Sequence, residues 1–269
     1  MSLRYVPMIP LPDQGFLELG DQRLEYRMIG PRPGDAPTLI VLHEGLGCVG
    51  MWGDFPDNLA DATGCGVFVY SRQGYGRSSP AQLPRRLDFM HDEARKTLPK
   101  ILDAIGFQRG LLVGHSDGAS IAAIYGGSFQ DHRVNGIVLM APHFIVEDVT
   151  STSIQEFRRA YDTTDLRARL ARYHDDVDAT AHGWSDVWLK GDFRKWDLTE
   201  ELAYIRVPVL IIQGVDDQYG TMRQVEIAQE ECYCPVEVLM LPDTKHVPHR
   251  EAPEQTLDAI VDFVRRALP

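Results

Sequence analysis

The sequence predicts an α/β fold in which a mostly parallel sheet carries helices on both faces. Short apolar runs, typical of strands buried on both faces, alternate along the chain with helical patterns. At 269 residues, 44% of them apolar and 25% charged, the chain can bury the core that one such domain needs. The alternation stops once, between residues 143 and 200. We therefore expect a sheet core from residues 1–142 and 201–269, with residues 143–200 inserted as a helical cap.

The first half of the chain supplies six of eight expected strands. Residues 15–29 alternate apolar and polar side chains around a turn at Gly20-Asp21, which predicts a β-hairpin. Helical periodicity predicts a helix over residues 86–105, which Gly106 stops and Pro99 bends or divides. Continuous apolar runs predict four buried strands, at residues 38–42, 66–70, 110–113 and 134–140.

The second half begins with the cap and then returns to alternating strands and helices. Ser153 and Glu156 match a capping box, which predicts a helix N-terminus at Ser153. Beyond the cap, the same patterns predict strands at 207–213 and 236–241 and helices at 221–231 and 253–268. The sheet is therefore expected to have eight strands, with the cap inserted after the sixth.

The segment Gly114-His115-Ser116-Asp117-Gly118 connects an apolar strand to a helix of small residues over 119–125. Its two glycines allow the backbone and the helix to approach more closely than a Cβ would permit. A strand–turn–helix of this kind holds its serine in a strained conformation, with the hydroxyl above the sheet. We interpret Ser116 as a nucleophile, which needs a base in contact and an acid to orient that base.

Two later loops are candidates for the base and the acid, because each directly follows a predicted strand. The segment Gly214-Val215-Asp216-Asp217 follows the strand that ends at residue 213. The segment Thr244-Lys245-His246 follows the strand that ends at residue 241. The order Ser, Asp, His along the chain is that of α/β-hydrolases.

These motifs together resemble the α/β-hydrolase fold superfamily, over nearly the whole chain. The resemblance implies that Ser116, Asp217 and His246 form a catalytic triad and that no metal or organic cofactor is needed. It also implies an oxyanion hole made by the backbone N–H groups of Asp117 and Leu46. Gly45 is the alternative to Leu46, because Glu44 lengthens this loop. The motifs are His43-Glu44-Gly45-Leu46-Gly47, Ser71–Ser78, the segment around Ser116, Gly214–Asp217 and His246–Pro253.

Several rival assignments stay open. Asp216 is a rival acid, and so are Glu147 and Asp148, which follow the sixth strand. His249 is the rival base, with a structural role next to the last helix as its other interpretation. The carboxylate of Asp117 would oppose an oxyanion, so we expect it to turn away and to be held by structural contacts.

The cap contains residues that are candidates for contacts with the substrate. Trp184 and Trp188 are candidate substrate-binding residues for an apolar or aromatic acyl compound, and with Trp196 they equally suit packing of the cap on the core. Five cap arginines would either attract a substrate carboxylate or form a solvated face: Arg158, Arg159, Arg167, Arg169 and Arg172.

The sequence thus predicts a serine hydrolase that cleaves a small-molecule ester, lactone or related carbon–carbon bond through an acyl-enzyme on Ser116. Alternatives are an acyltransferase or perhydrolase with the same triad, and a non-catalytic small-molecule receptor on the same scaffold.

Composition limits the partners and the location. A net charge of −12 argues against nucleic acid or an anionic membrane surface as a partner. The sequence has no apolar run of about 18 residues, and Met1–Pro7 lacks the apolar run of a signal peptide. We therefore expect a cytoplasmic protein that binds a small-molecule substrate, and a homodimer is compatible with the sequence. Four scattered cysteines are expected to be free thiols: Cys48, Cys65, Cys232 and Cys234.

Overall fold

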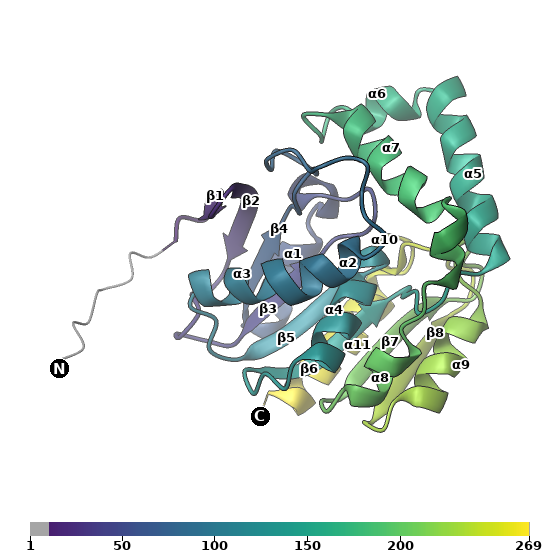
Figure 1. Ribbon diagram of the computed structural model, residues 1–269. Helices are drawn as coiled ribbons and strands as arrows, with labels where there is room; N and C mark the ends of the chain where they lie inside the picture. The colour runs from purple at the N-terminus through teal and green to yellow at the C-terminus, as the bar shows by residue number, and fades with distance from the viewer. Residues whose placement is uncertain (1–10, 269) are drawn as a thin grey trace.

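A computed structural model describes residues 11–268 and has the predicted α/β architecture (Figure 1). The segment Met1–Pro7, where no signal peptide is expected, lies outside the described residues. Eight strands form one sheet in the order β1-β2-β4-β3-β5-β6-β7-β8, and only the pairs β1–β2 and β2–β4 are antiparallel. The strands are β1 (Gln14–Leu19), β2 (Gln22–Ile29), β3 (Thr38–Leu42), β4 (Gly66–Tyr70), β5 (Gly110–His115), β6 (Val134–Met140), β7 (Val209–Gly214) and β8 (Val236–Leu241).

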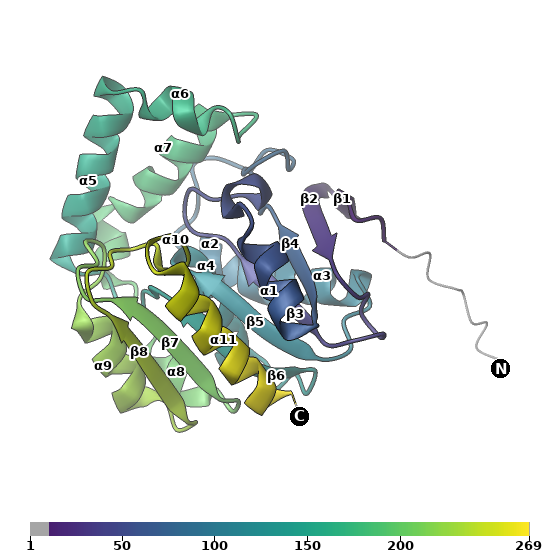
Figure 2. The same ribbon diagram turned by 180° about the vertical axis from the view of Figure 1, so that it is seen from behind.

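Helices cover both faces of this sheet (Figure 1 and Figure 2). The helices α1 (Phe55–Thr63) and α11 (Pro253–Ala267) lie on the face seen in Figure 2. Successive residues of one strand pack on opposite faces of the sheet. Leu39 of β3 packs in the core between the sheet and the helices α1 and α11, and Ile40 packs in the core on the other face. That other face carries α2 (Phe89–Asp92), α3 (Leu98–Ala104), α4 (Asp117–Ser128), α8 (Thr199–Tyr204) and α9 (Met222–Glu231).

The helix predicted over residues 86–105 forms in three parts. It begins with α2, continues as the π-helical segment η2 (Glu93–Thr97) and ends with α3. Pro99 follows helical residues without a break and has no N–H to donate to the preceding turn, where the bonding is π-helical and the Leu98 N–H donates to the Glu93 carbonyl. Gly106 follows with a φ of 70°, a conformation that favours glycine at a helix end. The irregularity predicted near Pro99 therefore takes the form of a π-helical turn within a continuous helical run.

Residues 143–200 contain helices and, apart from an isolated bridge between Ile145 and Asp197, no strand. The prediction that a helix begins at Ser153 is wrong. The helix α5 begins earlier, at Asp148, and the Ser153 hydroxyl donates to the main-chain oxygen of Gln218 at 2.5 Å. The segment contains α5 (Asp148–Thr163), α6 (Leu166–Leu170), α7 (Val177–Trp188) and the 3-10 helix η3 (Gly191–Lys195) (Figure 1).

Two short helical segments precede longer helices. The 3-10 helix η1 (Val49–Trp52) precedes α1, and α10 (Pro248–Glu251) precedes α11. Among residues 11–268, none of the helices combines the length and the apolar character needed to cross a membrane. The four cysteines are free, as the sequence predicted.

Candidate active site

Ser116 lies on a tight turn between β5 and α4. Its φ of 53° and ψ of −119° lie in a region that residues with a side chain rarely adopt. The turn is fixed where the Ser116 N–H donates to the Met140 carbonyl at 2.9 Å. A Cβ on Gly114 would lie 2.3 Å from the main-chain oxygen of Gly118, and one on Gly118 would lie 2.0 Å from that of Leu42. Both glycines of the motif are therefore required by close backbone contacts.

The structure brings the side chains of Ser116, His246 and Asp217 together. The Nε2 of His246 lies 2.9 Å from the Oγ of Ser116. The Nδ1 of His246 lies 2.9 and 2.8 Å from the two carboxylate oxygens of Asp217. An ionised carboxylate only accepts hydrogen bonds, so Nδ1 carries a proton and Nε2 is free to accept the serine proton.

Asp217 is buried and surrounded by donors, with a side chain only 1% exposed. Its oxygens accept from the N–H of Tyr219 at 2.8 Å, the N–H of Gly220 at 3.3 Å and the amide of Gln213 at 2.8 Å. Burial alone would raise the pKa of Asp217, but His246 and the Tyr219 N–H lower the pKa to about 2. The carboxylate is therefore ionised at neutral pH and orients the imidazole.

The other candidate acids do not contact His246. Asp216 is exposed at the surface, although it is next to Asp217 in the chain. The Glu147 carboxylate accepts from the N–H of Thr221 at 2.9 Å and from the amide of Gln224 at 2.7 Å. The Asp148 side chain is 89% exposed at the start of α5. Of the four candidate carboxylates, only that of Asp217 contacts His246.

The loop that follows β3 runs past this serine and carries the candidate oxyanion donors. The N–H of Gly47 is occupied, because it donates to the Glu44 carbonyl at 3.1 Å. The Leu46 carbonyl lies 2.9 Å from Nε2 of His174, a residue of the cap. Asp117 is the first residue of α4, where N–H groups have no acceptor within the helix. These contacts leave Leu46 and Gly45 as the candidates for the second donor, as in the sequence analysis.

The Asp117 side chain is buried next to Arg72. The Nη2 of Arg72 lies 3.8 Å from the Asp117 carboxylate, and no group among residues 11–268 donates a hydrogen bond to either oxygen. Burial raises the pKa of the Asp117 carboxyl, and the nearby Arg72 partly offsets this effect. The carboxylate is turned toward Arg72 and the indoles of Trp184 and Trp188, as expected for a structurally held group, although none of these contacts has regular hydrogen-bond geometry.

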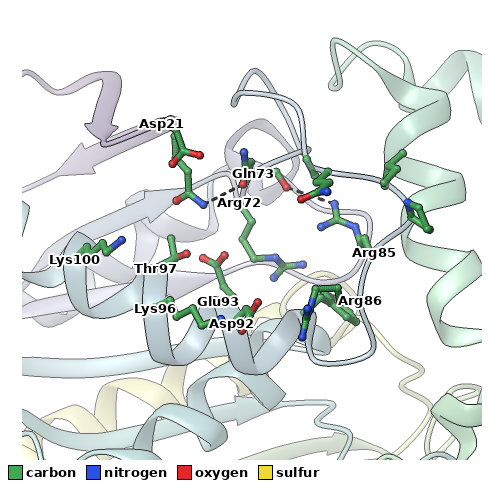
Figure 3. A pocket seen from close by; sticks show the side chains of 16 residues that line it. Asp21, Arg72, Gln73, Arg85, Arg86, Asp92, Glu93, Lys96, Thr97 and Lys100 are labelled. Atoms are coloured by element: carbon green, nitrogen blue, oxygen red, sulfur yellow. Dashed lines mark hydrogen bonds and ion pairs between the residues drawn. The ribbon is translucent and has the colours of Figure 1, made fainter.

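A cavity of about 570 Å³ lies on the other side of Arg72, between the loop that follows β4 and the helices α2 and α3 (Figure 3). Its lining includes Arg72, Arg85, Glu93 and Lys100 but neither Ser116 nor His246. It therefore adjoins the candidate active site through Arg72 rather than containing it. Ser116 is 5% exposed and His246 is 7% exposed, so the three central residues are almost closed off from solvent.

Two predicted substrate-binding residues, Trp184 and Trp188 of α7, lie directly at this site. A Cβ on Gly45 would lie 2.0 Å from Nε1 of Trp184, so the indole rests on the candidate oxyanion loop. Trp188 packs against His143 with ring centroids 5.4 Å apart, and His143 in turn lies 5.6 Å from His246. Neither indole N–H makes a hydrogen bond of regular geometry within residues 11–268, but both face the Asp117 carboxylate and lower its pKa.

Other parts of the cap lie in a different environment. Trp196 stacks on Phe193 with ring centroids 5.6 Å apart. The guanidinium of Arg167 pairs with Asp178 at 2.6 Å on the surface, with more than half of its side chain exposed. These contacts fit a solvated arginine face better than a site for a substrate carboxylate.

Sequence reasoning missed two histidines that contact the site. His143 donates toward the Tyr219 carbonyl at 3.2 Å and lies between Trp188 and His246. The Nδ1 of His174 accepts the N–H of Gly76 at 2.9 Å while its Nε2 faces Leu46. Neither histidine belongs to a motif, so no spacing in the sequence indicates these contacts.

The fold and this site define a hydrolase of the α/β type. The chain belongs to the alpha/beta hydrolase family, whose profile matches residues 39–259. Among its relatives, a proline iminopeptidase of Lactiplantibacillus plantarum is 25% identical over 232 residues, which cover 71% of this chain and 80% of the relative. The 3-oxoadipate enol-lactonase 1 of Acinetobacter baylyi is 26% identical over 254 residues, which cover 87% of this chain and 90% of the relative.

Solved structures share the same fold. The enol-lactonase from Burkholderia xenovorans LB400 superposes with a TM-score of 0.73 at 20% identity, covering 93% of this chain and 100% of that one. A hydrolase from Pseudomonas aeruginosa superposes with a TM-score of 0.70 at 21% identity, covering 93% and 98% of the two chains.

Proposed function

We propose that the protein is a serine hydrolase that cleaves a small-molecule ester or lactone through an acyl-enzyme on Ser116. The observation that carries this proposal is the chain of contacts from the Ser116 hydroxyl to His246 at 2.9 Å and from His246 to Asp217 at 2.8 Å. His246 takes the hydroxyl proton as Ser116 attacks the acyl carbon, and Asp217 stabilises the imidazolium that forms. Water then attacks the acyl group, with His246 again as the base.

The negative charge that develops on the acyl oxygen needs donors aimed at it, and we assign these to the N–H groups of Asp117 and Leu46. The start of α4 supports the first assignment, because its N-terminal N–H groups and its dipole favour an anion. Gly45 is the alternative to Leu46. A protonated Asp117 carboxyl, or one paired with Arg72, avoids placing a full negative charge beside this oxyanion.

The substrate class rests on the relatives and on the cap. The enol-lactonase that aligns with 87% of this chain supports a cyclic or open ester as substrate. Trp184 and Trp188 supply apolar walls, while their indole N–H groups face the Asp117 carboxylate, so they suit an acyl group with an apolar body.

Acyl transfer to an acceptor other than water is the second candidate. It is favoured by a relative from Pseudomonas putida, the dihydrolipoyllysine-residue acetyltransferase component of an acetoin cleaving system, which is 25% identical over 96% of this chain. Product analysis with an alcohol, a thiol or hydrogen peroxide added to the assay distinguishes the two: an acyl-transfer enzyme gives mainly the acylated acceptor, and a hydrolase gives mainly the free acid.

The main test combines a fluorophosphonate probe with a panel of p-nitrophenyl esters, lactones and ring-cleavage dienoates. We expect the probe to label the wild type, and Ser116→Ala to abolish both labelling and turnover. Ser128→Ala, at the far end of α4, is the matched control and should behave as wild type. An unlabelled wild type that turns over none of these compounds would instead favour the non-catalytic receptor.

A further inference from the structure

His115 contacts the candidate base His246 without belonging to the triad, and Glu44 lies next to His115. The His115 ring is 1% exposed, and its Nε2 lies 2.7 Å from the main-chain oxygen of His246. Its Nδ1 lies 3.6 Å from the Glu44 carboxylate. We propose that Glu44 and His115 are a positioning pair that holds the main chain of His246 and thereby fixes where its imidazole lies. This inference rests on the proposed function, because it assigns a role in placing the catalytic base.

The contacts of His115 determine which of its atoms carry protons. A main-chain carbonyl only accepts, so Nε2 of His115 must donate to His246. On the other side of the ring, Nδ1 of His115 faces the Glu44 carboxylate. At 3.6 Å this contact is longer than a hydrogen bond. Burial alone would raise the pKa of Glu44, but His115 brings the pKa well below its ordinary value.

Contacts at the main chain of Glu44 and the space left by Gly47 around its carboxylate place this residue next to His115. Its main-chain carbonyl accepts from Nδ1 of His43 at 2.7 Å, from Nη2 of Arg72 at 3.0 Å and from the N–H of Gly47 at 3.1 Å. Its carboxylate lies in the space that a Cβ on Gly47 would need, 2.3 Å from that position. The extra residue in the oxyanion loop therefore has a defined place, and the glycine after it makes room for the carboxylate.

The pair connects three loops that must keep their spacing for catalysis: the oxyanion loop through Glu44, the serine turn through His115, and the loop after β8 through His246. Asp217 orients the His246 imidazole at its side chain, whereas His115 holds the same residue at its main chain. With only one of these two restraints, the ring can shift relative to Ser116. A displacement of about 1 Å costs about 100-fold in rate.

The experiment compares Glu44→Gln, His115→Gln and the double variant with the wild type. Glutamine at 44 keeps the shape of the side chain but removes its charge, and glutamine at 115 keeps an N–H that can reach the His246 carbonyl. We expect Glu44→Gln to lower kcat by about 10-fold with KM unchanged, and the double variant to lose no more than the worse single variant. The proton NMR resonance of the His246 Nδ1–H, shared with Asp217, should shift in Glu44→Gln. Glu18→Gln, with a side chain 70% exposed on β1, is the matched control.

The outcomes separate positioning from a structural role and from failure of the proposed function. Wild-type kcat and an unshifted resonance in Glu44→Gln would overturn the proposal, as would a fall in melting temperature with kcat unchanged, or additive losses in the double variant. The resonance needs no substrate, so it tests the pair even if the wild type hydrolyses nothing. If Glu44→Gln does not fold, His115→Gln carries the same test.

Discussion

The sheet core and the cap meet at the same site, but they differ in the atoms that surround their glycines. Next to the candidate serine and acid, a Cβ added to a core glycine would meet backbone atoms, as at Gly118 against the Leu42 oxygen and at Gly214 against the Lys245 oxygen, 2.1 Å away. At the cap boundary it would meet side chains, as at Gly45 against Trp184 and at Gly183 against Leu83. The core therefore holds the reacting groups in fixed positions, whereas the cap contacts them through side chains that can move.

The largest effect is expected where the core orients the base. Asp217→Asn removes the charge that holds the His246 tautomer, so kcat should fall by about 10³- to 10⁴-fold while the protein stays folded. Asp216→Asn is the matched control, since Asp216 is adjacent but exposed. Steady-state kinetics with circular dichroism as a check of folding measures both. Loss of activity in Asp216→Asn alone would show that the neighbouring carboxylate is the acid.

A pair of glycine variants tests the comparison directly. Gly118→Ala places a methyl 2.0 Å from a backbone oxygen, so we expect a loss of about 3 kcal/mol or more in unfolding free energy. Gly45→Ala places it equally close to the Trp184 indole, which can turn aside, so we expect a loss of about 1 kcal/mol. Gly191→Ala, with no heavy atom within 4 Å, is the neutral control. Urea denaturation measures all three, and equal losses at 118 and 45 would contradict the distinction.

The same difference explains how much could be predicted from the sequence. Core strands such as β3, β5 and β7 are buried on both faces, so their continuous apolar sequences can be recognised. Ser116 and Asp217 lie just after two of these strands, and His246 lies in the loop after the partly buried β8. Contacts between residues far apart in the sequence cannot be predicted from such local patterns. Ser153 matches a capping box locally, but its hydroxyl bonds Gln218 in a distant loop. Likewise, Glu44 was recognised as an extra residue, whereas its contact with His115 depends on how two strands pair.

The helix α1 was not predicted at all, because its buried face is short. Only Phe55, Pro56, Leu59 and Ala60 are buried in it, and glycine follows it at Gly64. Two turns of helix with a proline in the first turn show too few repeats of an apolar pattern for the period to be recognised.

Histidines at the boundary between core and cap should make stability depend on pH. Burial, with a smaller effect of His246, lowers the pKa of His143 from the ordinary 6.5 to about 4. The unfolded chain therefore binds a proton that the folded chain excludes, so stability is complete above about pH 6.5 and falls as the pH drops toward 4. The loss from His143 is at most about 3 kcal/mol. Burial also lowers the pKa of His43 and His249, which adds to the effect.

Urea denaturation at pH 7.5 and pH 5 measures this loss. His143→Gln should make stability less dependent on pH, whereas His132→Gln, at an exposed position, should leave the dependence unchanged. An unchanged pH dependence in His143→Gln would show that His143 is not kept neutral in the folded state.

The smallest effect is expected where the cap contacts the substrate. Trp184 packs edge-on against Phe157 with ring centroids 5.4 Å apart, and it is 6% exposed. Trp184→Phe leaves an aromatic ring but removes the indole from above Gly45, so kcat/KM for aromatic acyl esters should fall by about 10-fold relative to acetyl esters. Trp196→Phe is the matched control, because Trp196 packs on Phe193 and on the outer side of the site at Trp188 rather than over Gly45. Equal selectivity in the two variants would mean that Trp184 only packs the cap onto the core, because a side chain that lines the acyl site must change the ratio between large and small acyl groups.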